Sequence, residues 1–351
     1  YEFALPQLKA GSIIEYQATT QQIKPYIAKE WFSSINFHFV KFLPNINWLR
    51  IDPVLETINR ITVPKETDIS IVNYNIDITP KITKTKLHST YTWQTSKQPE
   101  VVLETEMPSL DDILPSVHLS TIKHWSTVNH WFNELYLPTQ QSDQAITALA
   151  ATIFRPEMSD EEKIKAVFNY MQKNVRYIGA HVASEVLSQA YGDCKDQTVL
   201  IIALLKQADI QAYPAMINTY PGAKFDDGLP MLNFDHMITY VKTKTDTYWL
   251  DTSGQTGTFP GISLNLEAKK AFVVNEKVGE IVQLPVTTSA DNIATVNIDF
   301  SLNKTILNTQ VSLDLVGHVE TNLRNYMQFS PNALAAAEQI MSPLLFNKRI
   351  S

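Results

Sequence analysis

The sequence of 351 residues contains a single cysteine, Cys194. One cysteine excludes an intramolecular disulfide bond and a zinc site built from several cysteines, because both need more than one thiol. The shortage of cysteine leaves the cellular compartment open, since proteins without disulfides occur on both sides of a membrane.

The sequence also lacks a basic cluster and a long apolar run. Its net charge is -7 and its isoelectric point is about 5.6, and no single predicted element gathers enough lysine or arginine to neutralise phosphates. No apolar stretch approaches the roughly 20 residues of a membrane-spanning helix. We therefore expect no nucleic-acid partner and no transmembrane segment, and nothing in the sequence points to an oligomeric state. The chain begins at Tyr1, which is compatible with removal of a signal peptide or lipid anchor.

What is present fits a soluble enzyme of two or three domains. Hydrophobic residues make up 44% of the chain and charged residues 19%, which is enough apolar material for two substantial cores. Between residues 11 and 106, β-branched and aromatic runs alternate with turn signals, a pattern that predicts an all-β sandwich or barrel. The predicted strands are 13–19, 37–43, 58–63, 69–78, 82–93 and 101–106. Residues 107–117, with two prolines and two aspartates, are predicted to form a linker.

Helical periodicity follows the β region. We expect a helix over 121–136 capped by Ser120, a second that Ser142 caps and that runs to about residue 153, and a third that begins at Ser159. In the third, Glu162 completes the spacing of a capping box. Two tryptophans of the first helix, Trp125 and Trp131, are interpreted as core residues.

Cys194 lies in Tyr-Gly-Asp-Cys-Lys-Asp (191–196), directly before the apolar run 199–205. The first amides of a helix carry partial positive charge and bias a cysteine there toward the nucleophilic thiolate. A lone buried cysteine is more often an inert core residue, but a core position would not be bracketed by charges. Asp193 and Asp196 are expected to cap the helix, and Gly192 leaves room for a substrate backbone.

Strands 212–218, 234–241 and 247–251 are predicted to form an antiparallel set after the cysteine helix. His236 lies on the second strand and Asp251 closes the third. Each alone is more often structural, a hydrogen-bonded strand histidine and a turn aspartate. Strand alternation puts Phe234, His236, Ile238 and Tyr240 on one face, which we expect to face the cysteine helix. Together the chain order Cys, His, Asp is that of a catalytic triad.

These motifs closely resemble the transglutaminase-like (papain-like thiol) superfamily, and best its bacterial members with an uncharacterised β-rich domain in front. The resemblance rests on residues 191–196, Phe-Asp-His at 234–236 and Tyr-Trp-Leu-Asp at 248–251, with supporting context at 5–16, 119–125 and 175–179. The chain departs from its relatives at Asp209, where glycine is usual, and at Thr252-Ser253, where Pro-Thr is usual. Aspartate can adopt the left-handed cap conformation that glycine favours.

The resemblance implies an α+β protein in three parts. We expect a β-sandwich-like domain over 1–118, a transglutaminase-like catalytic domain over 119–290 with the cysteine helix packed on an antiparallel sheet, and part of a β-rich C-terminal domain over 291–351. It also implies an extracytoplasmic, periplasmic location in bacteria.

The implied activity is that of a thiol-dependent amide-bond enzyme, a cysteine peptidase or amidase or a transglutaminase-type acyltransferase, acting on a protein or peptide. Cys194 is the expected nucleophile, His236 the base and acid, and Asp251 the residue that orients the imidazole. The Cys194 amide is an oxyanion donor, and Gln189 and Tyr177 are equal candidates for a second donor. No cofactor or metal is expected. The alternative is a non-catalytic peptide-binding or protein-binding module on the same scaffold.

Overall fold

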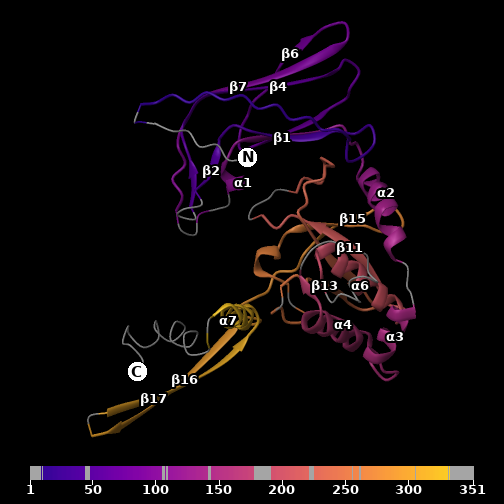
Figure 1. The fold of residues 1–351 in the computed structure, drawn as a ribbon, viewed down its shortest axis with the longest axis vertical. Helices are drawn as coiled ribbons and strands as arrows, with labels where there is room; N and C mark the ends of the chain where they lie inside the picture. The colour runs from indigo at the N-terminus through magenta and orange to yellow at the C-terminus, as the bar shows by residue number, and fades with distance from the viewer. Residues whose placement is uncertain are drawn as a thin grey trace.

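The computed structural model describes residues 9, 11–43, 48–104, 107, 110–140, 144–177, 191–220, 225–254, 256–260, 262–304, 306–330 and 332. The chain is a mixed α+β protein in three parts (Figure 1), which confirms the predicted fold class. The β-rich N-terminal sheets lie on one side of a helix-plus-sheet core, and a C-terminal hairpin extends from the other side. The domain boundaries at residues 118 and 290 remain predictions.

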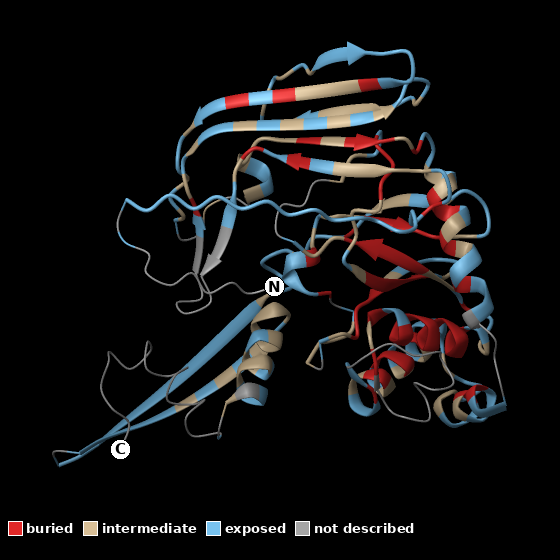
Figure 2. Ribbon diagram, turned by 45° about the horizontal axis from the view of Figure 1, so that its top comes forward, coloured by how far each residue is buried: buried red, intermediate tan, exposed pale blue. Residues whose placement is uncertain are grey.

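Two three-stranded antiparallel sheets enclose the N-terminal core. One has the order β1(Phe32–Asn36), β8(Ser116–Ser120), β5(Ser70–Tyr74), and the other β4(Val54–Pro64), β7(His88–Gln98), β6(Lys81–Lys84). A separate pair is formed by β2(Val40–Leu43) and β3(Trp48–Ile51). The cluster of Ile35, Phe37, Trp93, Val117 and Leu119 is buried between the two sheets, as the alternating buried positions in Figure 2 show. Inward alternation on facing strands is the packing of a sandwich.

Three expectations for this region are wrong. Residues 13–19 form no strand, and in 101–106 only Val101 makes an isolated bridge, to Ile51, while 105 and 106 lie outside the described residues. The predicted linker 107–117 contains α1(Leu110–Ile113) and the first two residues of β8, the central strand of its sheet. Its prolines suggested irregular backbone, but Val117 and Leu119 alternate into the core and fix the strand.

The helices of the central core are α2(Trp125–Tyr136), α3(Gln144–Ile153), α4(Asp160–Asn174) and α6(Cys194–Lys206), with the 3-10 turn η2(Leu137–Gln140) after α2. Ser159 caps α4 as predicted, because its Oγ accepts from the Glu162 amide at 3.2 Å while Glu162 Oε2 accepts from the Ser159 amide at 2.8 Å. Ser120 does not cap a helix: it belongs to β8, and its Oγ donates to the Pro230 carbonyl. Ser142 lies outside the described residues.

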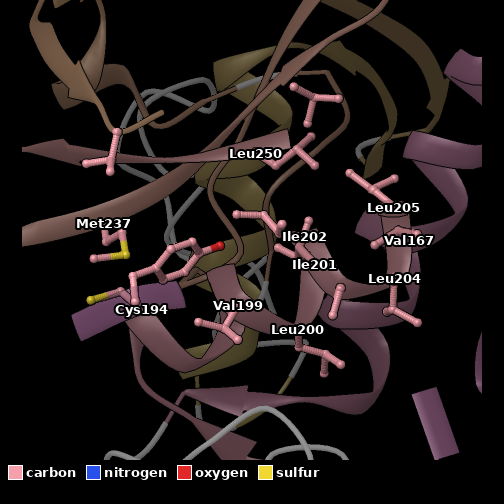
Figure 3. Packing of buried hydrophobic residues seen from close by; sticks show 14 of the residues in the cluster. Val167, Cys194, Val199, Leu200, Ile201, Ile202, Leu204, Leu205, Met237 and Leu250 are labelled. Atoms are coloured by element: carbon pink, nitrogen blue, oxygen red, sulfur yellow. The ribbon is translucent and has the colours of Figure 1, made fainter. Parts of the chain in front are cut away.

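Helix α6 is buried on every side from residue 196 to residue 205, because its run 199–205 is continuously apolar (Figure 3). It ends at Lys206, and in the turn that follows Asp209 has a φ of 57°, the left-handed conformation expected where relatives carry glycine. Trp125, interpreted from the sequence as a core residue, is partly buried and packs against the core cluster, with its ring 4.9 Å from that of Phe272. None of the described helices is long and apolar enough to cross a bilayer.

A five-stranded antiparallel sheet packs against α6, in agreement with the predicted antiparallel set. Its order is β13(Thr247–Leu250), β12(His236–Lys242), β11(Gln211–Ile217), β14(Lys270–Val273), β15(Glu280–Gln283). Met237 and Val241 join the cluster around α6, whereas Ile238 and Tyr240 face a second cluster with η3(Leu264–Leu266). The expectation that Ile238 and Tyr240 face the cysteine helix is therefore wrong, and both faces of the sheet are buried.

The C-terminal part consists of a long hairpin and a helix, in line with the predicted partial β-rich region. Strands β16(Ile293–Asn303) and β17(Ile306–Val316) pair along their length, and α7(His318–Phe329) follows. His318 Nε2 lies 2.6 Å from Glu267 Oε1, a contact that holds the start of α7 against the core.

Candidate active site

Cys194 is the first residue of α6, and the residues around it fix the start of the helix. Asp193 accepts hydrogen bonds at Oδ1 from the amides of Lys195 (2.9 Å) and Asp196 (3.1 Å). In return Asp196 Oδ2 accepts from the Asp193 amide at 2.9 Å. This reciprocal capping box confirms the predicted caps and leaves the Cys194 amide outside the helical hydrogen bonds.

His236 starts β12 and brings its imidazole to the start of α6. The ring makes a hydrogen bond with the Cys194 thiol, and its Nε2 lies 3.2 Å from Asp251 Oδ2. The His236 and Asp251 side chains are only 9% and 6% exposed. His236 pairs with Ile217 at the end of β12, and there its ring can reach the start of α6. Ile238 and Tyr240, which follow at alternate positions, face away from that helix. The structure thus brings the three predicted site residues together.

Asp251, directly after β13, is followed by the two residues that depart from the relatives, and the second of them, Ser253, bonds its carboxylate. Ser253 donates to Asp251 Oδ1 twice, from Oγ at 2.6 Å and from its amide at 3.0 Å. Thr252 Oγ1 donates to Gln197 Oε1 at 2.6 Å, and Gln197 Nε2 donates to the Gly192 carbonyl at 3.3 Å. The carboxylate and the helix start are therefore tied to each other through buried polar groups.

Sequence reasoning gave Thr252, Ser253 and Gln197 no role. A hydroxyl residue placed after an aspartate is a usual partner of that carboxylate in a turn, and this signal pointed to Ser253. Gln197 carried no comparable signal, because its partners come from outside its own helix.

Electrostatics at the site favour a charged sulfur and a charged ring. Burial opposes the thiolate, but the hydrogen bond and charge of His236, with the Met237 amide and Lys195, lower the pKa of Cys194. Burial also opposes the imidazolium, yet Asp251 and Cys194 raise the pKa of His236 to about 10. The pKa of Asp251 is lowered against its burial by His236 and Ser253. A thiolate-imidazolium pair backed by a carboxylate follows from these directions.

Tyr177, one of the two candidate second donors, lies beside the cysteine. Strand β9(Arg176–Tyr177) runs parallel to β10(Tyr191–Gly192), with Tyr177 opposite Gly192. The phenol makes hydrogen bonds with the thiol and the backbone amide of Cys194, and burial together with the sulfur's charge raises the pKa of Tyr177 to about 12. The other candidate, Gln189, lies outside the described residues.

Cys194 and His236 open onto a groove with a cavity volume of about 580 Å³, in the range of small-molecule and peptide sites. Asp251 does not line this groove. The groove therefore exposes the sulfur and the imidazole, while the carboxylate lies behind the ring.

A cysteine at the start of a buried helix, with histidine and aspartate presented by an antiparallel sheet, defines a thiol-enzyme scaffold. Residues 147–249 match the sequence model of the transglutaminase-like superfamily. Residues 3–102 match a domain of unknown function with a solved structure, DUF3857. The chain carries a transglutaminase-like core preceded by a DUF3857 domain, as the resemblance predicted.

Solved structures that match the chain include the following two. A crystal structure described as a putative protease from Parabacteroides distasonis matches with a TM-score of 0.55 and 14% identity over 81% of this chain and 56% of that one. A second, described as a putative cysteine protease from Cytophaga hutchinsonii, has a TM-score of 0.29 and 12% identity, covering 82% of this chain and 93% of that one. The chain thus spans little more than half the length of the Parabacteroides protein, with which it shares the fold. No curated protein matches the chain.

Proposed function

We propose that the protein cleaves or transfers amide bonds of protein or peptide substrates through a Cys194-His236-Asp251 triad. The observation that supports this most strongly is the continuous contact from the Cys194 thiol to the His236 ring and on to Asp251 at 3.2 Å. A site that only bound peptides would have no physical need for all three groups in this arrangement.

The first half of the reaction forms a thioester. The Cys194 sulfur attacks the carbonyl carbon of the scissile amide, and the carbonyl π electrons move onto the oxygen. His236, as imidazolium, donates its proton to the amide nitrogen, the C–N bond breaks, and the amine leaves. Asp251 holds Nε2 of the ring, which leaves Nδ1 for the proton transfer, and it stabilises the cationic ring before this transfer.

The second half releases the acyl group. Water or a primary amine attacks the thioester carbonyl, neutral His236 takes the proton of the attacking group, and the C–S bond breaks to restore the thiolate. Water gives a peptidase or amidase, and an amine gives a transferase. Both outcomes use the same triad, and exclusion of water from the thioester decides between them.

The oxyanion would be stabilised by the Cys194 amide at the helix start and by the Tyr177 hydroxyl. The two groups lie next to each other beside the sulfur, because the amide donates to the phenol oxygen. A carbonyl oxygen that displaced the phenol from the amide would then accept from both donors. One such donor contributes roughly 3 kcal/mol of transition-state stabilisation.

The test is turnover of a peptide library by the purified protein, with and without a primary amine such as cadaverine, and mass spectrometry of the products. We expect cleaved peptides, or amine adducts if transfer dominates, and neither with Cys194→Ala. Turnover by Cys194→Ala, or none by the parent protein together with an unreactive thiol, would contradict the proposal and favour a binding module.

A further inference from the structure

The groove beside Cys194 has walls made mainly of aromatic and aliphatic side chains from widely separated parts of the chain. They are Tyr26, Phe32, Trp131, Phe132, Leu232 and Phe234. The Tyr26 and Phe32 rings stack with centroids 6.1 Å apart, and the Trp131 and Phe132 rings meet edge to face at 6.3 Å. Trp131, interpreted from the sequence as a core residue, is only partly buried because one side of it faces the groove.

One wall comes from the segment that leads into the N-terminal sheet, and this segment is fixed in place. Ile27 is 6% exposed and belongs to the cluster around α6, so the segment is anchored in the catalytic core. Farther along, the Trp31 amide donates to Thr121 Oγ1 at 2.8 Å, and the Thr121 amide donates to the Trp31 carbonyl at 2.8 Å. Tyr26 and Phe32 flank these anchors and are thereby held over the groove.

The charged side chains that line the groove are already paired. Lys195 Nζ lies 3.1 Å from Asp193 Oδ2. Asp235 accepts from the amide and the hydroxyl of Thr219, each at 2.6 Å. Recognition of a charged substrate side chain would have to break one of these contacts, whereas an apolar side chain gains by leaving water.

We propose that this groove selects peptides with a large aromatic or aliphatic side chain at one of the two residues before the amide attacked by Cys194, and that the N-terminal part supplies half of the specificity site. The inference rests on the proposed function. Aromatic rings prefer offset or edge-to-face contacts with other rings, and the four rings of Tyr26, Phe32, Trp131 and Phe132 offer both. The paired charges of Lys195 and Asp235 leave polar groups beside the apolar walls, which suits a peptide better than a fatty acyl chain.

The experiment uses p-nitrophenyl esters of N-acetylated amino acids and dipeptides. The variable residue, Phe, Leu, Ala, Lys or Glu, is placed first or second before the ester, and p-nitrophenyl octanoate is included. We expect kcat/KM for Phe to exceed that for Ala by roughly 10- to 100-fold in one of the two positions, the effect of burying one large apolar side chain. Lys and Glu should be no better than Ala.

The matched variants are Tyr26→Ala and Tyr16→Ala. Both tyrosines are exposed, at 68% and 78%, so neither change should affect folding, but only Tyr26 lines the groove. Tyr26→Ala should lower the Phe-to-Ala ratio of kcat/KM by roughly 5- to 10-fold, a fraction of the effect of a full pocket. Tyr16→Ala should keep the parent ratio. Phe32→Ala, checked for folding by circular dichroism, should act in the same direction as Tyr26→Ala.

Specificity and activity can fail separately in this design. Rapid acylation of Cys194 by all esters without a preference for Phe or Leu, a preference for octanoate, or an unchanged ratio in Tyr26→Ala would each overturn the inference and leave the proposed function standing. If no ester reacts, the proposed function fails. Calorimetry then measures the affinity of the groove in Cys194→Ala for N-acetyl-Phe-amide and N-acetyl-Ala-amide without turnover. Equal affinities would overturn the inference.

Discussion

Nε2 of His236 lies 3.2 Å from Oδ2 of Asp251, and the two residues come from the start of β12 and the end of the neighbouring strand β13. Because β12 and β13 are antiparallel, the start of one lies beside the end of the other. A single hairpin therefore sets the distance between the imidazole and the carboxylate. The cysteine is supplied separately by α6, whose start is tied to Thr252, next to Asp251, through Gln197.

Replacing Cys194 with alanine should abolish turnover and leave the fold intact. The side chain is small and sits at a helix start rather than in the middle of the core, so the free energy of unfolding should fall by only about 1 kcal/mol. Thermal unfolding followed by circular dichroism checks the fold, and trapping of a thioester by mass spectrometry checks the chemistry. A Cys194→Ala protein that still forms product would disprove the thiol mechanism.

The rate of iodoacetamide alkylation should depend on pH through His236. In the parent protein the thiol pKa is lowered and the His236 pKa is about 10, so the thiolate-imidazolium pair exists between these two values. The alkylation midpoint should lie below that of free cysteine, near pH 8.5. In His236→Ala the charge and hydrogen bond are gone while burial remains, so the midpoint should move above pH 8.5. His130→Ala, which removes an exposed histidine that does not line the groove, is the control and should leave the midpoint unchanged.

Asp251→Asn should lower kcat by roughly 10³- to 10⁴-fold with a smaller change in KM, because an amide can hold the ring in the wrong tautomer and cannot stabilise its charge. The His236 pKa should fall from about 10, because the carboxylate is the main group that raises it against burial. A nuclear magnetic resonance titration of the imidazole measures that shift. Asp299→Asn, on the exposed strand β16, should leave both kcat and the titration unchanged.

Ser253→Ala removes the 2.6 Å hydrogen bond from Oγ to Asp251 but keeps the bond from the amide. Hydrogen bonds to charged groups contribute about 1.5–3 kcal/mol, so we expect kcat to fall by roughly 10-fold or more with KM nearly constant. The alkylation midpoint of Cys194 should rise as well, which a purely structural role would not produce. Ser253→Thr restores a hydroxyl and should recover most of the activity; equal losses in both variants would argue against positioning.

Tyr177→Phe separates oxyanion stabilisation from thiolate formation. Loss of one donor, roughly 3 kcal/mol, should lower kcat by about 100-fold. Alkylation of Cys194 should change far less, because the histidine contact remains. Tyr220→Phe, which removes a hydroxyl from an exposed tyrosine, is the matched control. A Tyr177→Phe enzyme with parent kcat would remove Tyr177 from the mechanism.

The parts of the site that could be predicted from the sequence are those whose residues lie within one short segment. The capping box around Cys194 and the strand positions of His236 and Asp251 follow from local patterns, and the structure places these residues together. Strand β8 could not be predicted, because the prolines and aspartates of residues 108–115, just before it, are typical of a linker, and only the flanking strands bury Val117 and Leu119.

The groove could not be predicted from the sequence for a different reason. Tyr26, Trp131 and Phe234 lie in segments with unrelated patterns, and only packing makes them neighbours. The hydrogen bond from Ser253 to Asp251 was easier to predict, because Ser253 departs from the residue usual in relatives, but its hydroxyl was assigned no role.

Ile27 is buried among the side chains around α6, so the segment that leads into the N-terminal sheets is packed into the central core. A fragment that begins after the N-terminal sheets would lose Ile27 from the cluster around α6. It would also lose Phe32, which forms part of one wall of the groove. A fragment that retains the core should therefore begin ahead of Tyr26, with the N-terminal sheets still attached.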